Sequence, residues 1–248
     1  MERLMKCHWR VNDNIFTAET DRYRQKGIKM EYVAEIKNVS KRFGDETVVR
    51  EVSLSLEPGK IYGIAGRNGS GKTVLFKMII GFLRPTMGKI FVHGKEIGKD
   101  ADFAEDTGII IETPGFLGGF SGYKNLEYLA AIKKRIGREE IRKSMELVGL
   151  DPDSRKKVKK YSLGMRQRLG IAQAIMEHPK FLVLDEPMNG LDREGAAEIR
   201  ELFLRLKEEG TTILLSSHHR EDMEELCDKV YGMEDGRLQR SAAFHLTR

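Results

Sequence analysis

One glycine-rich octapeptide limits the folds open to this 248-residue chain more than any other feature. Residues 66–73 read GRNGSGKT and match the spacing G-x-x-x-x-G-K-[ST] throughout. The pattern before it predicts a short buried strand over 61–65, and the pattern after it predicts an apolar helix over about 72–83. A strand, a glycine-rich turn and a helix in this order open a βαβ unit, so we expect an α/β protein.

The residue types in this loop indicate phosphate binding. Glycines let the backbone curl so that successive N–H groups point at phosphate oxygens, and the helix N-terminus adds a partial positive charge. Lys72 would supply a full charge near the terminal phosphates, and Thr73 a hydroxyl for Mg²⁺. An ordinary glycine-rich turn is the alternative, which the flanking strand and helix disfavour. The expected nucleotide contacts in the loop are Gly66, Arg67, Asn68, Gly69, Ser70, Gly71, Lys72, Thr73 and Val74.

Two acidic residues end a second apolar strand, which reads FLVL over 181–184. Ligands bind open α/β sheets at the carboxyl ends of the strands, where Asp185 and Glu186 are expected to lie. Asp185 is predicted to hold the Mg²⁺ shell, and Glu186 is predicted to act as the base that orients a water toward the γ-phosphate. The alternative is that both acids cap the next helix.

A third strand, expected over 211–215, runs into the tripeptide SSH at 216–218. Its end should emerge at the same edge of the sheet as the two acids. His218 is therefore predicted to contact the γ-phosphate and to take part in catalysis with Glu186 and Lys72. A histidine with a purely structural role is the competing interpretation.

The spacing of apolar residues divides the rest of the chain into segments. Residues 1–29 show no clean pattern and are expected to be a weakly ordered extension or an over-called start, followed by one domain over 30–248. Short alternating segments after residue 30 predict an antiparallel β subdomain. Helical periodicity predicts an inserted α-helical subdomain over about 115–165, and later crossover helices predict a mostly parallel core sheet.

Composition excludes several classes of protein. The apolar runs are far shorter than the roughly 20 residues that a membrane-spanning helix needs. Cys7 and Cys227 are the only cysteines, so no disulfide framework is indicated and a reducing cytosol fits. The net charge of +5 is thinly spread, which argues against a dedicated nucleic-acid binder. The basic run RKKVKK at 155–160 is interpreted as a solvated segment.

Residues 161–169, YSLGMRQRL, look like the signature segment of ABC transporter ATP-binding subunits, and the chain resembles that family from about 31 to 238. The resemblance implies the P-loop NTPase fold of the ABC type. It also implies two subunits packed head to tail, so that Ser162 and Gly164 of one close over the γ-phosphate bound by the other. Asp192 would reach across the interface, and Phe43 would stack on adenine. A simple helix start at Ser162 and a core or surface role for Phe43 are the alternatives.

Two departures narrow the resemblance. Where the family usually has a glutamine that contacts Mg²⁺ and relays to the membrane partner, this chain has Glu112, followed by Thr-Pro-Gly. The signature has Leu163 and Met165 in place of the usual Gly and Gln. Together these segments look most similar to the ATP-binding subunits of bacitracin or lantibiotic-type exporters.

The resemblance implies an ATPase that binds ATP and Mg²⁺, with Thr73, Glu112 and Asp185 at the metal. It would energise export of a peptide antibiotic or similar hydrophobic compound through a separate multi-spanning permease, at the cytoplasmic face of the membrane. Its partner in the dimer would be a second copy or a homologous ATPase subunit, and no nucleic acid is expected. An importer subunit, a non-transport ABC ATPase, a small-molecule kinase and a binding-only regulator are the alternatives.

Overall fold

The computed structural model describes residues 32–112 and 115–240, which belong to the unit Tyr32–Arg248. The extension expected over residues 1–29 lies outside the described residues. Two β-sheets organise the described part, one of six strands in the order β10-β9-β3-β8-β7-β6 and one of four in the order β2-β1-β4-β5. The larger sheet contains β3 (Ile61–Ala65), β6 (Thr107–Ile110), β7 (Phe181–Leu184), β8 (Thr212–Ser216), β9 (Lys229–Glu234) and β10 (Arg237–Arg240). The smaller sheet contains β1 (Ala34–Phe43), β2 (Glu46–Leu56), β4 (Met87–Val92) and β5 (Lys95–Glu96).

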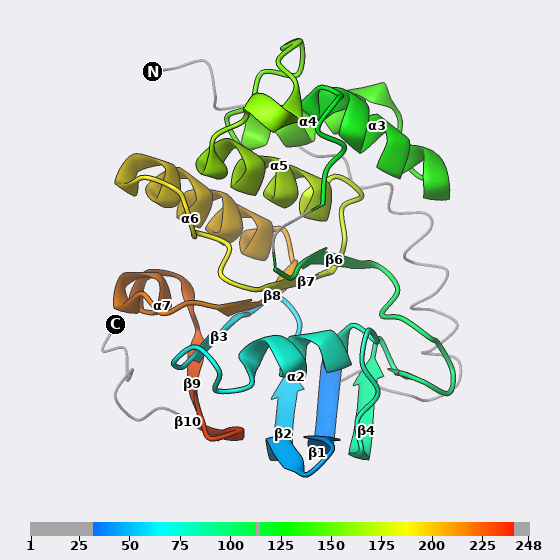
Figure 1. The fold of residues 1–248 in the computed structure, drawn as a ribbon, viewed down its shortest axis with the longest axis vertical. Helices are drawn as coiled ribbons and strands as arrows, with labels where there is room; N and C mark the ends of the chain where they lie inside the picture. Colours follow the sequence, from blue (N-terminus) through cyan, green and yellow to red (C-terminus); the bar gives the residue numbers. More distant parts are fainter. Residues whose placement is uncertain (1–31, 113–114, 241–248) are drawn as a thin grey trace. The chain divides into compact units, whose positions relative to one another are not determined.

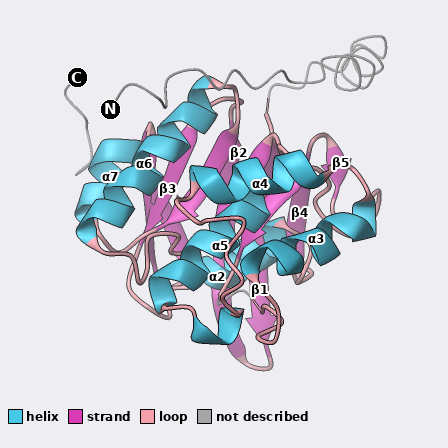
Figure 2. Cartoon of the chain, turned by 90° about the horizontal axis from the view of Figure 1, so that it is seen from above, coloured by secondary structure: helices cyan, strands magenta, loops and turns pink. Residues whose placement is uncertain are grey.

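Helices cover both faces of the larger sheet. Those described are α2 (Lys72–Ile79), α3 (Gly122–Lys133), α4 (Arg138–Leu147), α5 (Leu163–Ile175), α6 (Arg193–Glu208), α7 (Arg220–Leu226) and a short 3-10 turn, η1 (Val158–Lys160). Figure 1 shows α2 between the two sheets, and Figure 2 shows α3, α4, α5 and α6 gathered over the opposite face of the larger sheet. Within the described residues, no helix combines the length and the apolar character that crossing a membrane requires.

The larger sheet is mostly parallel, as the crossover helices predicted. β3 pairs with β8 and β9 in parallel, and β7 pairs in parallel with β6 and β8, whereas β10 joins β9 antiparallel. The carboxyl ends of β3, β7 and β8 therefore meet at one edge of the sheet. The smaller sheet is antiparallel, so the expected fold class is confirmed.

The strands of the larger sheet contribute side chains to two hydrophobic cores, because successive side chains point to opposite faces of the sheet. Leu182 and Leu184 pack under the helices α3 to α6, whereas Phe181 and Val183 pack against α2 and the smaller sheet. Every residue of β7 is buried, which explains why its sequence is continuously apolar. The two cores hold the sheet edge rigidly between them.

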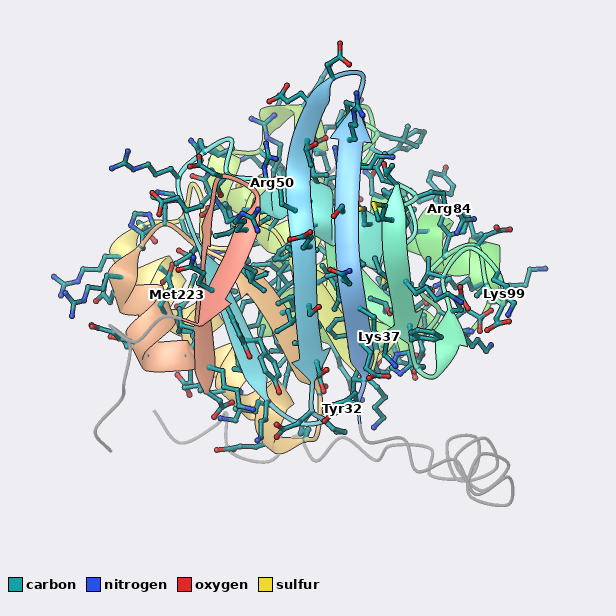
Figure 3. All side chains as sticks on the ribbon, turned by 90° about the horizontal axis from the view of Figure 1, so that it is seen from below. Tyr32, Lys37, Arg50, Arg84, Lys99 and Met223 are labelled. Atoms are coloured by element: carbon teal, nitrogen blue, oxygen red, sulfur yellow. The ribbon has the colours of Figure 1, made fainter. Side chains whose placement is uncertain are left out.

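The smaller sheet buries one face against α2 and exposes the other. Figure 3 looks onto its exposed face, where Lys37 of β1 and Arg50 of β2 project outward. Helix α2 is shorter than the predicted 72–83, since it ends at Ile79 and Gly81 has φ +92°. A residue in that left-handed conformation cannot continue the helix, and glycine adopts it at little cost.

The helical insert predicted over about 115–165 corresponds to α3, α4 and η1, which lie between β6 and β7, and α5 then returns the chain to the sheet. The side chain of Ser121 accepts the backbone N–H of Lys124 and begins α3. Ser162 accepts the backbone N–H of Met165 and begins α5. These local caps fix where the helices start.

Gly108 of β6 lies where α5 crosses the sheet. A Cβ at this position would lie 2.0 Å from the backbone oxygen of Ala174 in α5. We expect Gly108→Ala to lower the free energy of unfolding by about 1–3 kcal/mol, because the helix backbone has to move away. Chemical denaturation measures the change. Gly119→Ala, where a Cβ meets nothing within 4 Å, is the matched control and should shift stability by less than about 0.5 kcal/mol. Equal effects of the two substitutions would contradict this account of the packing.

Candidate functional site

The glycine-rich loop connects β3 to α2 in the position that its sequence predicts. Gly69 has φ +82° and Gly71 has φ +106°, a left-handed conformation that other residues rarely adopt. Gly71 precedes the first turn of α2, which has no side-chain cap on its N-terminal N–H groups. Those N–H groups remain free for an anion.

The loop is packed closely against its neighbours. A Cβ on Gly66 would lie 2.4 Å from the backbone oxygen of Met233 in β9, and one on Gly71 would lie 2.8 Å from that of Val48 in β2. Within the loop, the hydroxyl of Ser70 is buried without a hydrogen-bond partner. A phosphate oxygen fits such a group, because a buried hydroxyl left without a partner is costly.

Lys72 is held inside the loop rather than extended into solvent. Its ammonium group donates to the backbone oxygens of Gly66 at 2.6 Å and Arg67 at 3.1 Å, and the residue is 5% exposed. The loop therefore combines the full charge of Lys72 with backbone N–H groups, and both favour binding of an anion.

Asp185 joins three elements at the edge of the larger sheet. Thr73 of α2 donates its hydroxyl to Oδ2 at 2.6 Å, and Ser216 of β8 donates to Oδ1 at 2.5 Å. The same Ser216 oxygen accepts the backbone N–H of Glu186 at 2.9 Å. The end of β7 is therefore fastened to the start of α2 and to the end of β8.

Glu186 and His218 form the second half of the cluster. The Nδ1 atom of His218 lies 2.8 Å from Oε2 of Glu186. The other carboxylate oxygen, Oε1, is buried without a partner, so a water or ligand atom fits there. Glu186 has φ +49°, an uncommon conformation for a residue with a side chain. Such local strain is typical of functional positions.

A divalent cation fits beside Asp185 only with additional ligands. Thr73 and Asp185 supply the hard oxygen atoms that Mg²⁺ prefers. Across residues 32–112 and 115–240, no group of three or more His, Cys, Asp or Glu side chains is arranged to hold a metal. The cation would therefore take its remaining ligands from phosphate oxygens and water, which is usual for Mg²⁺.

Glu112 is not hydrogen-bonded to Asp185 but to α2. Lys77 donates to Oε1 of Glu112 at 2.5 Å, and the Glu112 side chain is 65% exposed. Because Lys77 follows Thr73 by four residues, both side chains lie on the same face of α2. The predicted role of Glu112 as a metal ligand stays a prediction, since its carboxylate would have to exchange Lys77 for the cation.

The signature residues lie at the exposed N-terminus of α5. Ser162 is exposed, and a Cβ on Gly164 would lie 2.9 Å from the backbone oxygen of Gly190. Asp192 caps α6 by accepting the backbone N–H of Gly195 at 2.9 Å. The turn before α6 therefore packs against the start of α5, and the contacts expected across a dimer interface stay predictions.

Most of the remaining predicted nucleotide contacts are open to solvent. Phe43 is 45% exposed at the end of β1, with the ammonium group of Lys41 5.0 Å from its ring centroid. Arg67 and Asn68 in the loop are exposed, and Val74 is half-buried. An exposed ring that already faces a cation leaves its other side available for stacking.

Sequence reasoning missed three residues that shape this site: Ser216, Lys77 and Gln167. Gln167 of α5 donates its side-chain amide to the backbone oxygen of Pro187 at 2.9 Å, directly after Glu186. The position of Ser216 at a strand end offered a signal, because it precedes a predicted catalytic histidine by two residues. Gln167 lies within the segment 161–169 that carries the family resemblance, whereas no local signal marks Lys77, whose partner Glu112 is distant in the sequence.

Comparison with known proteins agrees with this geometry. Residues 49–189 match the family described as ABC transporter. The chain is 44% identical to the bacitracin transport ATP-binding protein BcrA of Enterococcus faecalis, over 84% of this chain and 68% of that protein. It is 36% identical to the lantibiotic transport ATP-binding protein SrtF of Streptococcus pyogenes, over 82% of this chain and 87% of that protein.

Solved structures share the fold. The cbiO1 protein of Clostridium perfringens, part of the ABC transporter complex cbiONQ, gives a TM-score of 0.73 at 26% identity, covering 84% of this chain and 87% of that one. The ATP-binding cassette MJ0796, in a dimeric post-hydrolysis state bound to ADP and Pi, gives a TM-score of 0.74 at 22% identity, covering 84% and 97%. The likeness to MJ0796 concerns the fold.

Lys72→Ala is expected to weaken MgATP binding by about tenfold to a hundredfold, because it removes a buried charge from the anion cradle. Isothermal titration calorimetry measures the affinity. Lys99→Ala, which removes a lysine whose side chain is 70% exposed, is the control and should bind MgATP like the parent. An unchanged affinity in Lys72→Ala would contradict the assignment of the loop.

Proposed function

This chain belongs to the ABC transporter family as one of its ATP-hydrolysing subunits, and from that premise we propose that it drives export of a peptide antibiotic or similar hydrophobic compound. One observation carries the proposal for the site. Glu186 and His218, the proposed catalytic pair, lie with the cationic loop at a single sheet edge, joined to it through the hydrogen bonds of Asp185 with Thr73 and Ser216. The transported class is suggested by relatives named for bacitracin and lantibiotic transport.

Phosphoryl transfer to water needs charge neutralisation more than covalent chemistry. Lys72 and the N–H groups of the loop would neutralise the negative charge that develops on the triphosphate. Thr73 and Asp185 would hold Mg²⁺, which supplies further charge neutralisation when it is bound. The charge of Lys72 is held inside the loop before ATP arrives, so little energy is lost to reorganisation during the reaction.

Glu186 would orient the attacking water and accept its proton. Its Oε1 atom is buried and has no hydrogen-bond partner, which leaves an acceptor for that water. The contact between Oε2 and His218 would hold the carboxylate in place, and His218 would contact the γ-phosphate from the end of β8. In the hydrolysis step, Glu186 would therefore act on the attacking water and His218 on the γ-phosphate.

A second ATP-binding subunit would complete the site. The exposed N-terminus of α5 carries Ser162 and Gly164, and a helix N-terminus favours an anion. Facing the loop of another subunit, these residues would close over the γ-phosphate, with Asp192 at the same interface. ATP binding would then close the dimer, and hydrolysis would open it.

A permease would receive this motion at the cytoplasmic face of the membrane. Phe120 and Tyr128, which are 43% and 42% exposed, pack edge to face with ring centroids 5.4 Å apart. Exposed aromatic pairs are typical of contact surfaces. We assign this aromatic pair to the contact with the permease.

Glu186→Gln is expected to reduce ATP turnover by about a hundredfold or more while leaving MgATP affinity intact, because the amide cannot accept the proton of the attacking water. Phosphate release at steady state and calorimetry measure the two quantities. Glu201→Gln, at an exposed position on α6, is the control and should keep parental turnover. A parental rate of ATP hydrolysis in Glu186→Gln would contradict the proposal that Glu186 accepts the proton of the attacking water.

Transport has its own test. Cells that carry this chain with its permease should tolerate a higher concentration of a peptide antibiotic such as bacitracin than cells with Glu186→Gln and the same permease, since export requires hydrolysis. The minimum inhibitory concentration measures tolerance, and Glu201→Gln should match the parent. The tagged parent should also copurify with a multi-spanning membrane protein. Equal tolerance with active and inactive subunits across peptide antibiotics would reject the proposed substrate class.

A further inference from the structure

A buried ion pair joins the helices α6 and α7 behind the site. Arg200 of α6 donates from Nη1 to Oδ1 of Asp222 in α7 at 2.8 Å. The two side chains are 9% and 3% exposed. Within the part of the chain that the structure describes, Asp222 is the only carboxylate that is buried. The hydrolysis chemistry proposed above uses neither residue.

The pair continues into the loop that carries His218. The hydroxyl of Ser217 donates to the second oxygen of Asp222, Oδ2, at 2.7 Å. The same hydroxyl accepts the backbone N–H of His219 at 3.0 Å. Ser217 is itself 2% exposed. The backbone on both sides of His218 is therefore tied to one carboxylate, which Arg200 fixes in turn.

Packing alone does not require charges at this position. Burying two ions costs several kcal/mol per ion in desolvation, and apolar residues of similar volume often stabilise a protein as well or better. Two other acids of α7, Glu221 and Glu225, also approach Arg200, at 3.8 and 2.8 Å, but are more than half exposed. They would suffice to attract α7 to α6. Only Asp222 extends the connection to the loop.

We propose that Arg200, Asp222 and Ser217 form a positioning network that holds His218 against Glu186 and so sets the rate of ATP hydrolysis. The inference rests on the proposed catalytic role of His218. The network acts through that side chain and does not touch the nucleotide, so it governs kcat and leaves the KM for ATP unchanged.

A double-mutant cycle tests the network with Ser217→Ala and His218→Ala. Ser217→Ala removes the hydroxyl but keeps the ion pair of Arg200 with Asp222, so folding should be retained. Loss of one hydrogen bond, about 1 kcal/mol, predicts a fall in kcat of about fivefold with an unchanged KM for ATP. In the His218→Ala background, Ser217→Ala should have no further effect on kcat, because residues acting through one group are not additive.

The matched control is Ser144→Ala. Ser144 of α4 is also fully buried and donates its hydroxyl to the backbone oxygen of Ile141 at 2.8 Å, remote in sequence from the catalytic residues. It should lower the melting temperature about as much as Ser217→Ala without changing kcat. Asp222→Asn provides a second variant in the network and should reduce kcat at constant KM, again only when His218 is present.

Each outcome has a distinct meaning. Parental kcat in Ser217→Ala, or effects of Ser217→Ala and His218→Ala that multiply, would overturn the positioning network. A changed KM for ATP in Ser217→Ala would overturn it as well. Parental kcat in His218→Ala would instead reject the catalytic role of His218 on which the inference rests. A fivefold loss in Ser217→Ala that vanishes without His218 supports the proposal.

Discussion

The hydrogen bonds of Asp185 to Thr73 and Ser216 hold the candidate site together. They connect the start of α2, the end of β7 and the end of β8, three segments that only the folded sheet brings into contact. Parallel pairing places the carboxyl ends of these strands at one edge, and the two cores keep that edge fixed. This connection places the glycine-rich loop beside the contact between Glu186 and His218.

The polar groups of the site differ in whether the protein itself supplies their hydrogen-bond partners. Each carboxylate oxygen of Asp185 accepts one hydrogen bond from a protein hydroxyl, whereas Glu186 keeps one buried oxygen without a partner. Lys72 is satisfied by backbone oxygens, and Ser70 is not. Groups that are satisfied define the geometry, and groups left without partners indicate where water and phosphate belong, because proteins rarely leave buried polar atoms without hydrogen bonds.

The loop, the strand-end acids and the helical insert could be predicted because each depends on neighbours in the sequence. Glycine at 69 and 71 permits the left-handed turns, and Ser162 is a local helix cap. The end of α2 could not be placed from periodicity, because the apolar pattern continues past Ile79 while the backbone turns at Gly81. The pattern of apolar residues predicts that a helix is present more reliably than it predicts the residue at which the helix ends.

By itself, the sequence determined the fold class, the phosphate loop and the chemical types at the sheet edge, since these follow from local patterns of glycine, charge and hydrophobic period. Only the tertiary structure decided which partners the charged groups take. Glu112 pairs with Lys77, and Asp222 connects Arg200 to Ser217. Such pairings join residues from different elements, and their distances depend on how helices pack on the sheet, which no local pattern specifies.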